Sequence, residues 1–183
     1  MSLLAELMSI DLLNLIALLA VVFIGLPHGA MDGALAIHFG WMSRPIHAVS
    51  FLLAYIGLAA LVVGIWLFAP TIGFLIFLAI SLFHFGRGDI VPRGKEHQIA
   101  EVLMRGGLVL AGISLFHRLE VNTIFEALIG SNTAPVWLFL QTVGVLTLML
   151  IPLVLRSKSP EERNAAGREI VGLILLFALV PPL

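Results

Sequence analysis

Two short motifs place histidine, aspartate and glycine inside long apolar stretches. In the first, GLPHGAMDG, His28 and Asp32 are four residues apart, a spacing that puts both side chains on one face of a helix. The second, SLFHFGRGD, contains His84 and ends at Asp89. An aspartate at the middle of a membrane helix costs roughly 2.5 to 3.5 kcal/mol, so its presence indicates a site that compensates the charge.

The two histidines predict a metal centre. Imidazole nitrogen binds iron, copper and zinc, and a carboxylate often accepts the second ring N–H and so fixes the tautomer. At helical rise, His28 lies about 25 Å and His84 about 20 Å from the start of their spans, which run in the same direction. We therefore expect His28 and His84 to be the ligands, with Asp32 and Asp89 orienting them.

The other ionisable residues within or beside apolar stretches have structural interpretations. Glu101 and Arg105 are one turn apart near the end of a predicted span, where an ion pair can form and both side chains can reach the interface. The remaining histidines lie in connections or at span ends, where interfacial hydrogen bonding or capping accounts for them: His38, His47, His97 and His117.

The elements that carry these residues must be membrane helices. The chain has 183 residues, of which 60% are hydrophobic and 11% charged, and its mean hydropathy is +1.10. Soluble domains carry about 25% charged residues. We expect an all-α, polytopic transmembrane helix bundle that forms one membrane-embedded domain over residues 1–183.

Hydropathy predicts about six spans, the last of them incomplete, because a spanning helix needs about 20 apolar residues and the final stretch from Ile170 to Leu183 has 14. A hairpin turn is expected at Ala69-Pro70-Thr71. The segment NTIFEALIG predicts a short interfacial helix with Asn122 as its N-cap. The expected spans are 11–38, 46–69, 71–88, 98–116, 134–155 and 170–183.

The charge distribution and the cysteine content limit the cellular location, the binding partners and the kinds of metal site that the sequence allows. The odd-numbered connections hold eight Lys and Arg and the even-numbered ones a single Arg, which predicts a multi-pass protein of the cell (inner) membrane with an extracytoplasmic N-terminus. A net charge of −1 without a basic tract gives no reason to expect a nucleic acid partner. The absence of cysteine excludes disulfides and thiolate metal sites.

Together with RGGLVLAGISLFHRLE, which runs from Arg105 to Glu120, the two motifs are similar in order and spacing to those of the Brp/Blh family of membrane β-carotene 15,15′-dioxygenases. The resemblance covers most of the chain. It implies a mononuclear non-haem Fe(II) held by intramembrane histidines, with His28 and His84 as ligands and no catalytic residue beyond the ligands. Asp32 and Asp89 then form the outer layer of this site.

The resemblance also implies that the chain is the N-terminal portion of a longer family member. In the family, a further histidine pair of the pattern H-S-x-R-H follows the proline pair that corresponds here to Pro181 and Pro182. Because this sequence ends at Leu183, two of the expected ligands lie outside it.

The implied reaction cleaves β-carotene at its central double bond with O2 and gives two retinal molecules, which points to a microbial rhodopsin as a functional partner. An apolar polyene reaches such a site from the lipid bilayer, between helices. Aromatic residues near the two motifs are candidates to line its tunnel: Phe39, Trp41, Phe83 and Phe85.

Two other functions fit the residues taken alone. Paired intramembrane histidines also ligate haem, as in membrane cytochromes, and a Soret band would identify that class. Asp32 and Asp89 could instead form the relay of a proton or ion transporter. No inverted repeat of the kind found in many transporters is evident in these spans.

Overall fold

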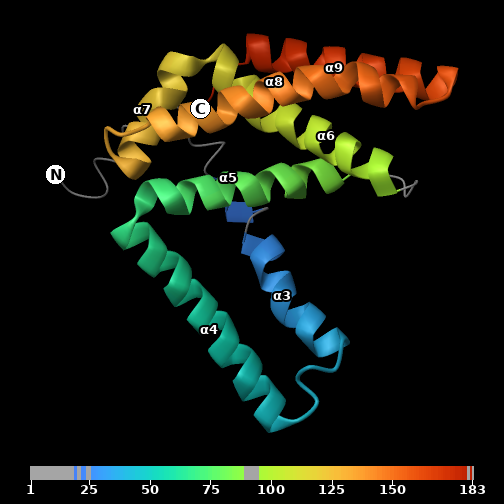
Figure 1. Ribbon diagram of the computed structural model, residues 1–183. Coiled ribbons are helices and arrows are strands. Elements are labelled where there is room, and N and C mark those ends of the chain that lie inside the picture. Colours follow the sequence, from blue (N-terminus) through green and yellow to red (C-terminus); the bar gives the residue numbers. More distant parts are fainter. Residues whose placement is uncertain (1–18, 20–21, 24–25, 89–94, 181, 183) are drawn as a thin grey trace. The chain divides into compact units, whose positions relative to one another are not determined.

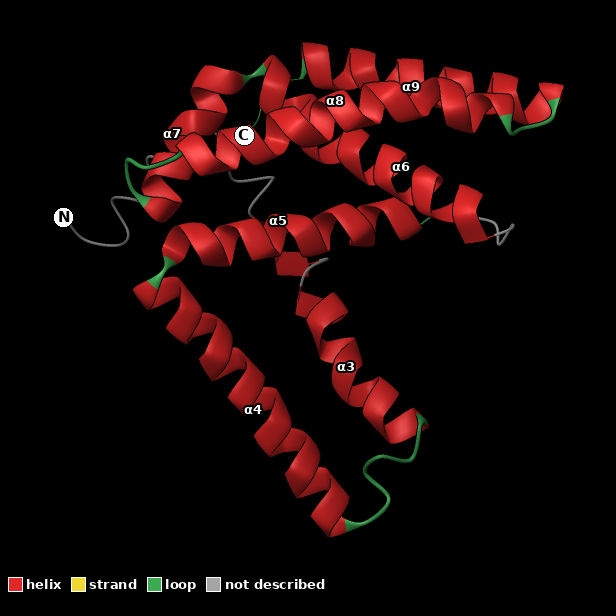
Figure 2. Cartoon of the chain, in the orientation of Figure 1, coloured by secondary structure: helices red, strands yellow, loops and turns green. Residues whose placement is uncertain are grey.

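The computed structural model describes residues 19, 22–23, 26–88, 95–180 and 182 (Figure 1). Within these ranges the chain consists of helices joined by turns and loops, without a strand (Figure 2). It divides into two compact units, Met1–Leu61 with Leu183, hereafter the first unit, and Val62–Pro182, the second unit. The all-α fold expected from composition is confirmed.

The first unit contains helix α3 (Leu26–His38) and most of helix α4 (Pro45–Phe68). A Schellman motif ends α3: the N–H of Trp41 donates to the carbonyl of Ala36 and the N–H of Gly40 to that of Ile37. Gly40 has φ +72°, a backbone conformation that glycine adopts without a steric penalty. Residues 26–33 of the GLPHGAMDG motif therefore lie at the start of α3, with Pro27 in the first turn, where a proline removes no helical hydrogen bond.

Among the residues that the structure describes, four helices are long and apolar enough to cross a membrane: α4, α5 (Pro70–Arg87), residues 98–116 of α6 (Lys95–Phe116), and α8 (Ala134–Arg156). No residue of α4 is buried, and its 24 residues carry no charge. The predicted break between two helices at Ala69-Pro70 is confirmed, because α4 ends at Phe68 and α5 begins at Pro70. These apolar helices make the chain a membrane protein.

Helix α6 is the centre of the second unit and packs against α5, α8 and α9 (Pro160–Leu179). Glycines allow these close approaches. A Cβ atom on Gly86 of α5 would overlap the Val102 carbonyl of α6, and one on Gly106 of α6 would overlap the Leu82 carbonyl of α5. Small residues drive helix association in lipid because they let backbones touch and gain dispersion contacts.

Buried apolar side chains of α5, α6, α7 (Arg118–Ile129) and α8 form the largest core cluster of the second unit. Phe74, Leu78 and Leu82 of α5 recur every four residues and therefore share one buried face. The largest cluster also includes Phe125 and Trp137, whose ring centroids lie 5.3 Å apart. A second cluster lies nearer the other end of α6 and comprises Met104, Leu108, Val154 and Ile170.

Two sequence-based boundaries are wrong. Helix α9 begins at Pro160, not at Ile170, and has 20 residues. The first half of α9 is charged, so hydropathy alone does not predict that it is helical. A capping box begins this helix: Ser159 accepts from the Glu162 backbone N–H, and the Glu162 carboxylate accepts from the Ser159 backbone N–H. Helix α7 begins at Arg118, so Asn122 lies inside it and is not its N-cap.

Gly106→Ala should destabilise the second unit by about 1–3 kcal/mol, because the added methyl group forces α5 and α6 apart. The measurement is the thermal midpoint of the detergent-solubilised protein. Gly172→Ala is the matched control, since a Cβ there meets nothing within 4 Å. Alanine favours helix over glycine, so the control should keep or raise the midpoint. An unchanged midpoint for Gly106→Ala would contradict the packing described for α5 and α6.

Candidate functional site

Residues 81–87 of the second motif lie on α5, with His84 on the side of the helix away from α6. Leu82 and Gly86 are buried against α6, and His84, two residues from each, lies on the opposite side of the helix and is exposed in the described chain. Phe83 and Phe85, which flank it, are 51% and 52% exposed. The α5–α6 crossing therefore fixes which face of α5 presents the imidazole.

The first motif lies on α3, but the side chains of His28 and Asp32 fall outside the described residues, and so does Asp89. The pairing of His28 with His84 and the orienting role of the two aspartates consequently stay predictions. Among the side chains that the structure describes, no three from histidine, aspartate and glutamate lie together as a metal site would require.

Two of the predicted tunnel residues belong to a row of aromatic rings in the first unit. Trp41 lies between Phe39 and Phe51, at centroid distances of 6.2 and 6.4 Å, and Phe51 stacks on Tyr55 at 6.1 Å. Phe39 is 64% and Trp41 59% exposed. Each ring in this row thus lies beside the next, and the role of Phe39 and Trp41 as tunnel residues stays a prediction.

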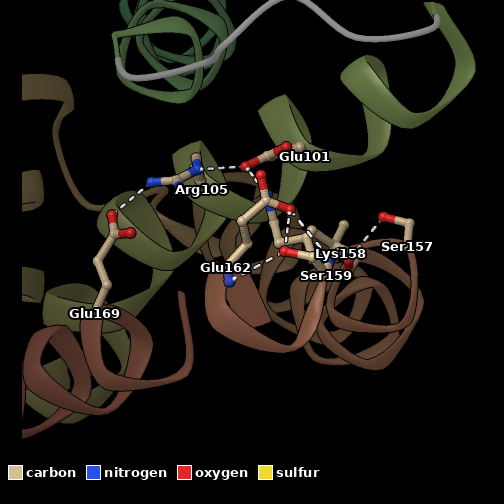
Figure 3. Close-up of polar contacts among 8 residues, drawn as sticks. Glu101, Arg105, Ser157, Lys158, Ser159, Glu162 and Glu169 are labelled. Atoms are coloured by element: carbon tan, nitrogen blue, oxygen red, sulfur yellow. Dashed lines mark hydrogen bonds and ion pairs between the residues drawn. The ribbon is translucent and has the colours of Figure 1, made fainter. Parts of the chain in front are cut away.

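The expected ion pair between Glu101 and Arg105 is confirmed and is part of a larger network (Figure 3). One oxygen of Glu101 accepts from Arg105 Nε at 3.1 Å and from Lys158 Nζ at 2.8 Å. Arg105 also donates to Glu169 of α9. Two cations and two carboxylates thus neutralise one another where α6 meets the α8–α9 connection and α9.

This network lies next to the helix crossing that presents His84. Val102, which contacts Gly86, directly follows Glu101 in the chain. Phe85, Arg105 and Glu169 line one cleft of about 260 Å³, together with apolar residues of α6 and α9. Phe85 of the second motif and the ion pair of Arg105 with Glu169 therefore line the same cleft.

His117 and Asn122 have tertiary roles that their sequence positions did not reveal. The His117 ring makes no capping hydrogen bond at the start of α7 but contacts the Phe177 carbonyl of α9 through Nε2 at 2.8 Å. Asn122 Oδ1 accepts from Trp137 Nε1 at 2.7 Å and from the Thr133 hydroxyl at 2.9 Å. The sequence gives one indication of the tertiary role of Asn122, which is a polar residue within a helix that is predicted to be interfacial.

Comparisons with known proteins agree with the family resemblance that the two histidine motifs indicate. A family model described as beta-carotene 15,15′-dioxygenase matches residues 19–183. A beta-carotene 15,15′-dioxygenase from an uncultured marine bacterium, 66A03, is 34% identical over 183 residues, an alignment that covers 96% of this chain and 64% of that relative. The probable beta-carotene 15,15′-dioxygenase Blh of Halobacterium salinarum is 28% identical, over 89% of this chain and 54% of its own length.

The chain therefore spans about 64% and 54% of the lengths of these two relatives. No solved structure matches it.

Glu101→Gln should lower the free energy of unfolding by about 1–3 kcal/mol, because Lys158 and Arg105 lose the charged oxygen they share in a largely buried setting. Chemical denaturation in detergent, followed by helix content, measures the change. Glu161→Gln is the control, since Glu161 is exposed in the first turn of α9. Equal losses in both variants would show that the network adds no specific stability.

Proposed function

The chain belongs to the β-carotene 15,15′-dioxygenase family, and on that basis we propose that it takes part in cleaving β-carotene at its central 15,15′ double bond. The reaction consumes O2 and gives two molecules of retinal. The observation that carries the proposal is the family match over residues 19–183, which includes both histidine motifs. Each oxygen atom of O2 ends in one aldehyde, so no proton is gained or lost and no general acid or base is required.

We further propose that His28 and His84 bind Fe(II). Imidazole nitrogens suit this ion, and the position of His84 on the exposed side of α5 keeps it out of the α5–α6 packing. Bound iron would supply the activation of dioxygen. In the proposal, Asp32 and Asp89 accept ring N–H groups and hold the imidazoles in one tautomer.

The protein's own contribution is to bind and position the substrate. β-Carotene is an uncharged polyene, so its binding requires apolar surface and few polar contacts. The exposed side of α5 offers such surface beside His84, with Phe77 at 58% and Ile80 at 63% exposure. Phe83 and Phe85 on α5, and Phe39 and Trp41 in the first unit, are the proposed contacts. Holding the central double bond near His84 lowers the barrier through proximity and excludes water.

The apolar helices also support a membrane location, from which the substrate is reached through the lipid. We propose the cell membrane, with the N-terminus on the extracytoplasmic side, on the strength of the Lys and Arg distribution. Retinal is the chromophore that a microbial rhodopsin needs, so a rhodopsin is the proposed user of the product.

His84→Ala and His28→Ala, each expressed from the complete gene in cells that make β-carotene, should abolish retinal formation and reduce iron per purified protein. The physical reason is the loss of an imidazole from the metal. Retinal is measured by chromatography and iron by elemental analysis. His47→Ala is the matched control, because His47 is exposed at the start of α4 and is not a proposed ligand.

Normal retinal formation by either ligand variant would remove that histidine from the site. Helix content and yield of the variants, compared with the wild type, separate loss of the metal from loss of folding. An equal loss of iron and retinal in His47→Ala would contradict the assignment as a whole.

A further inference from the structure

We propose that the second unit binds a glycerophospholipid in a groove along α8, with the lipid phosphate at Arg118 and an acyl chain further along the helix. The groove consists of two adjoining clefts. One stripe of α8 lines both, because Trp137, Gln141, Gly144 and Leu148 recur every three or four residues and share one helix face. The stripe is polar at its first turns and apolar beyond Gln141.

The polar cleft lies at the start of α8 and has a volume of about 530 Å³. Its lining contains a cation and several neutral hydrogen-bonding side chains, but no carboxylate. A site of this composition favours an anion over a cation, because nothing in the lining offsets the guanidinium charge. The polar residues in this lining that can face an anion are Arg118, Ser131, Asn132 and Gln141. Asn122 and Trp137 also line the cleft, but the Asn122 amide is bonded to Glu126, Thr133 and Trp137 and so supports the wall.

Arg118 is held in place by an aromatic ring and not by a counter-ion. Its guanidinium carbon lies 4.9 Å from the centroid of the Trp137 ring, and Trp137 is itself fixed by the hydrogen bond from Nε1 to Asn122. In the described part of the chain, Arg118 takes part in no ion pair. A stacked guanidinium keeps its N–H groups for an acceptor such as phosphate, which it binds bidentately.

The start of α8 adds partial positive charge at the same cleft. Thr133 occupies the N-cap position without a side-chain capping bond, because its hydroxyl donates to Asn122. Pro135 has no N–H, and the N–H groups of Val136 and Trp137 donate to the Thr133 carbonyl, so the first turn of α8 contributes the N–H of Ala134, which lines the cleft. This feature supports the anion site but does not by itself define it.

The apolar cleft begins where the polar one ends. Gln141 lines both, and the chain from Leu115 and Phe116 to Arg118 and Leu119 passes from the apolar to the polar lining. The apolar cleft has a volume of about 380 Å³ between α6, α8 and α9. Apart from Gln141, every residue that lines it is apolar or glycine, including Leu108, Gly112, Val145, Leu148 and Ile174.

The two halves together select an amphiphile. Free phosphate would leave the apolar cleft unoccupied, and a hydrocarbon such as a carotene has no group for Arg118. A glycerophospholipid carries one phosphate and long acyl chains, and a membrane supplies it at high local concentration. Leu138 lines the polar cleft and Leu148 the apolar one, each is 67% exposed, and both would extend the contact with the lipid.

The test is native mass spectrometry of the delipidated protein in detergent, titrated with phosphatidylglycerol, with diacylglycerol of the same acyl chains, and with inorganic phosphate. The wild type should retain phosphatidylglycerol about tenfold more strongly than diacylglycerol, because only the first offers a charged acceptor to Arg118. Inorganic phosphate at equal concentration should neither bind nor compete. Equal retention of both lipids, or displacement by phosphate alone, would overturn the proposal.

Two substitutions locate the site. Arg118→Gln should reduce phosphatidylglycerol retention to the level of diacylglycerol, and Val145→Trp, which fills the apolar cleft, should reduce both. Their matched controls are Arg156→Gln, an exposed cation at the other end of α8, and Leu146→Trp, a neighbour outside the cleft lining. Unchanged retention in both test variants would refute the site. If Val145→Trp fails to fold, Arg118→Gln and the comparison of lipids decide the outcome.

Discussion

The second unit depends on the contact of two helix backbones at Gly86 and Gly106. In lipid no hydrophobic force draws helices together, because the surrounding chains are as apolar as leucine, and close packing must take its place. The two glycines remove the side chains that would separate α5 from α6. This crossing buries one face of α5 and leaves His84 on the other, so it determines which side of the helix can present the imidazole.

Polar groups are few, and the structure uses them as connectors between helices. Glu101 accepts hydrogen bonds from Arg105 and Lys158, and Arg105 also donates to Glu169. These opposite charges connect α6, the α8–α9 connection and α9 (Figure 3). At the other end, Asn122 joins α7 to the first turn of α8. A polar side chain without a partner is costly in an apolar setting, which explains why such connections are shared among several residues.

The sequence predicts those features of the structure that depend on residues close together in the chain. Pro70 between two apolar runs placed the α4–α5 turn, and the helical spacing of Glu101 and Arg105 predicted their ion pair. Local patterns do not predict contacts between residues that are far apart in the sequence: Lys158 lies 57 residues from Glu101, and Glu169 lies 64 residues from Arg105. Asn122 looked like a helix cap because asparagine favours that position, yet the tertiary contact with Trp137 governs it. The metal pairing rests on motif and family resemblance, since the His28 side chain lies outside the described residues.

The proposed metal site requires that His28 and His84 lie close together, and cross-linking of the two positions measures this. Because the chain contains no cysteine, His28→Cys with His84→Cys creates a unique pair of thiols. A short bifunctional thiol reagent applied to membranes, followed by mass spectrometry of the peptides, measures whether the positions meet. If both positions face one ion, the double variant should give a cross-link between the two peptides. Its absence, while each single cysteine still reacts with a monofunctional reagent, would contradict the shared metal site.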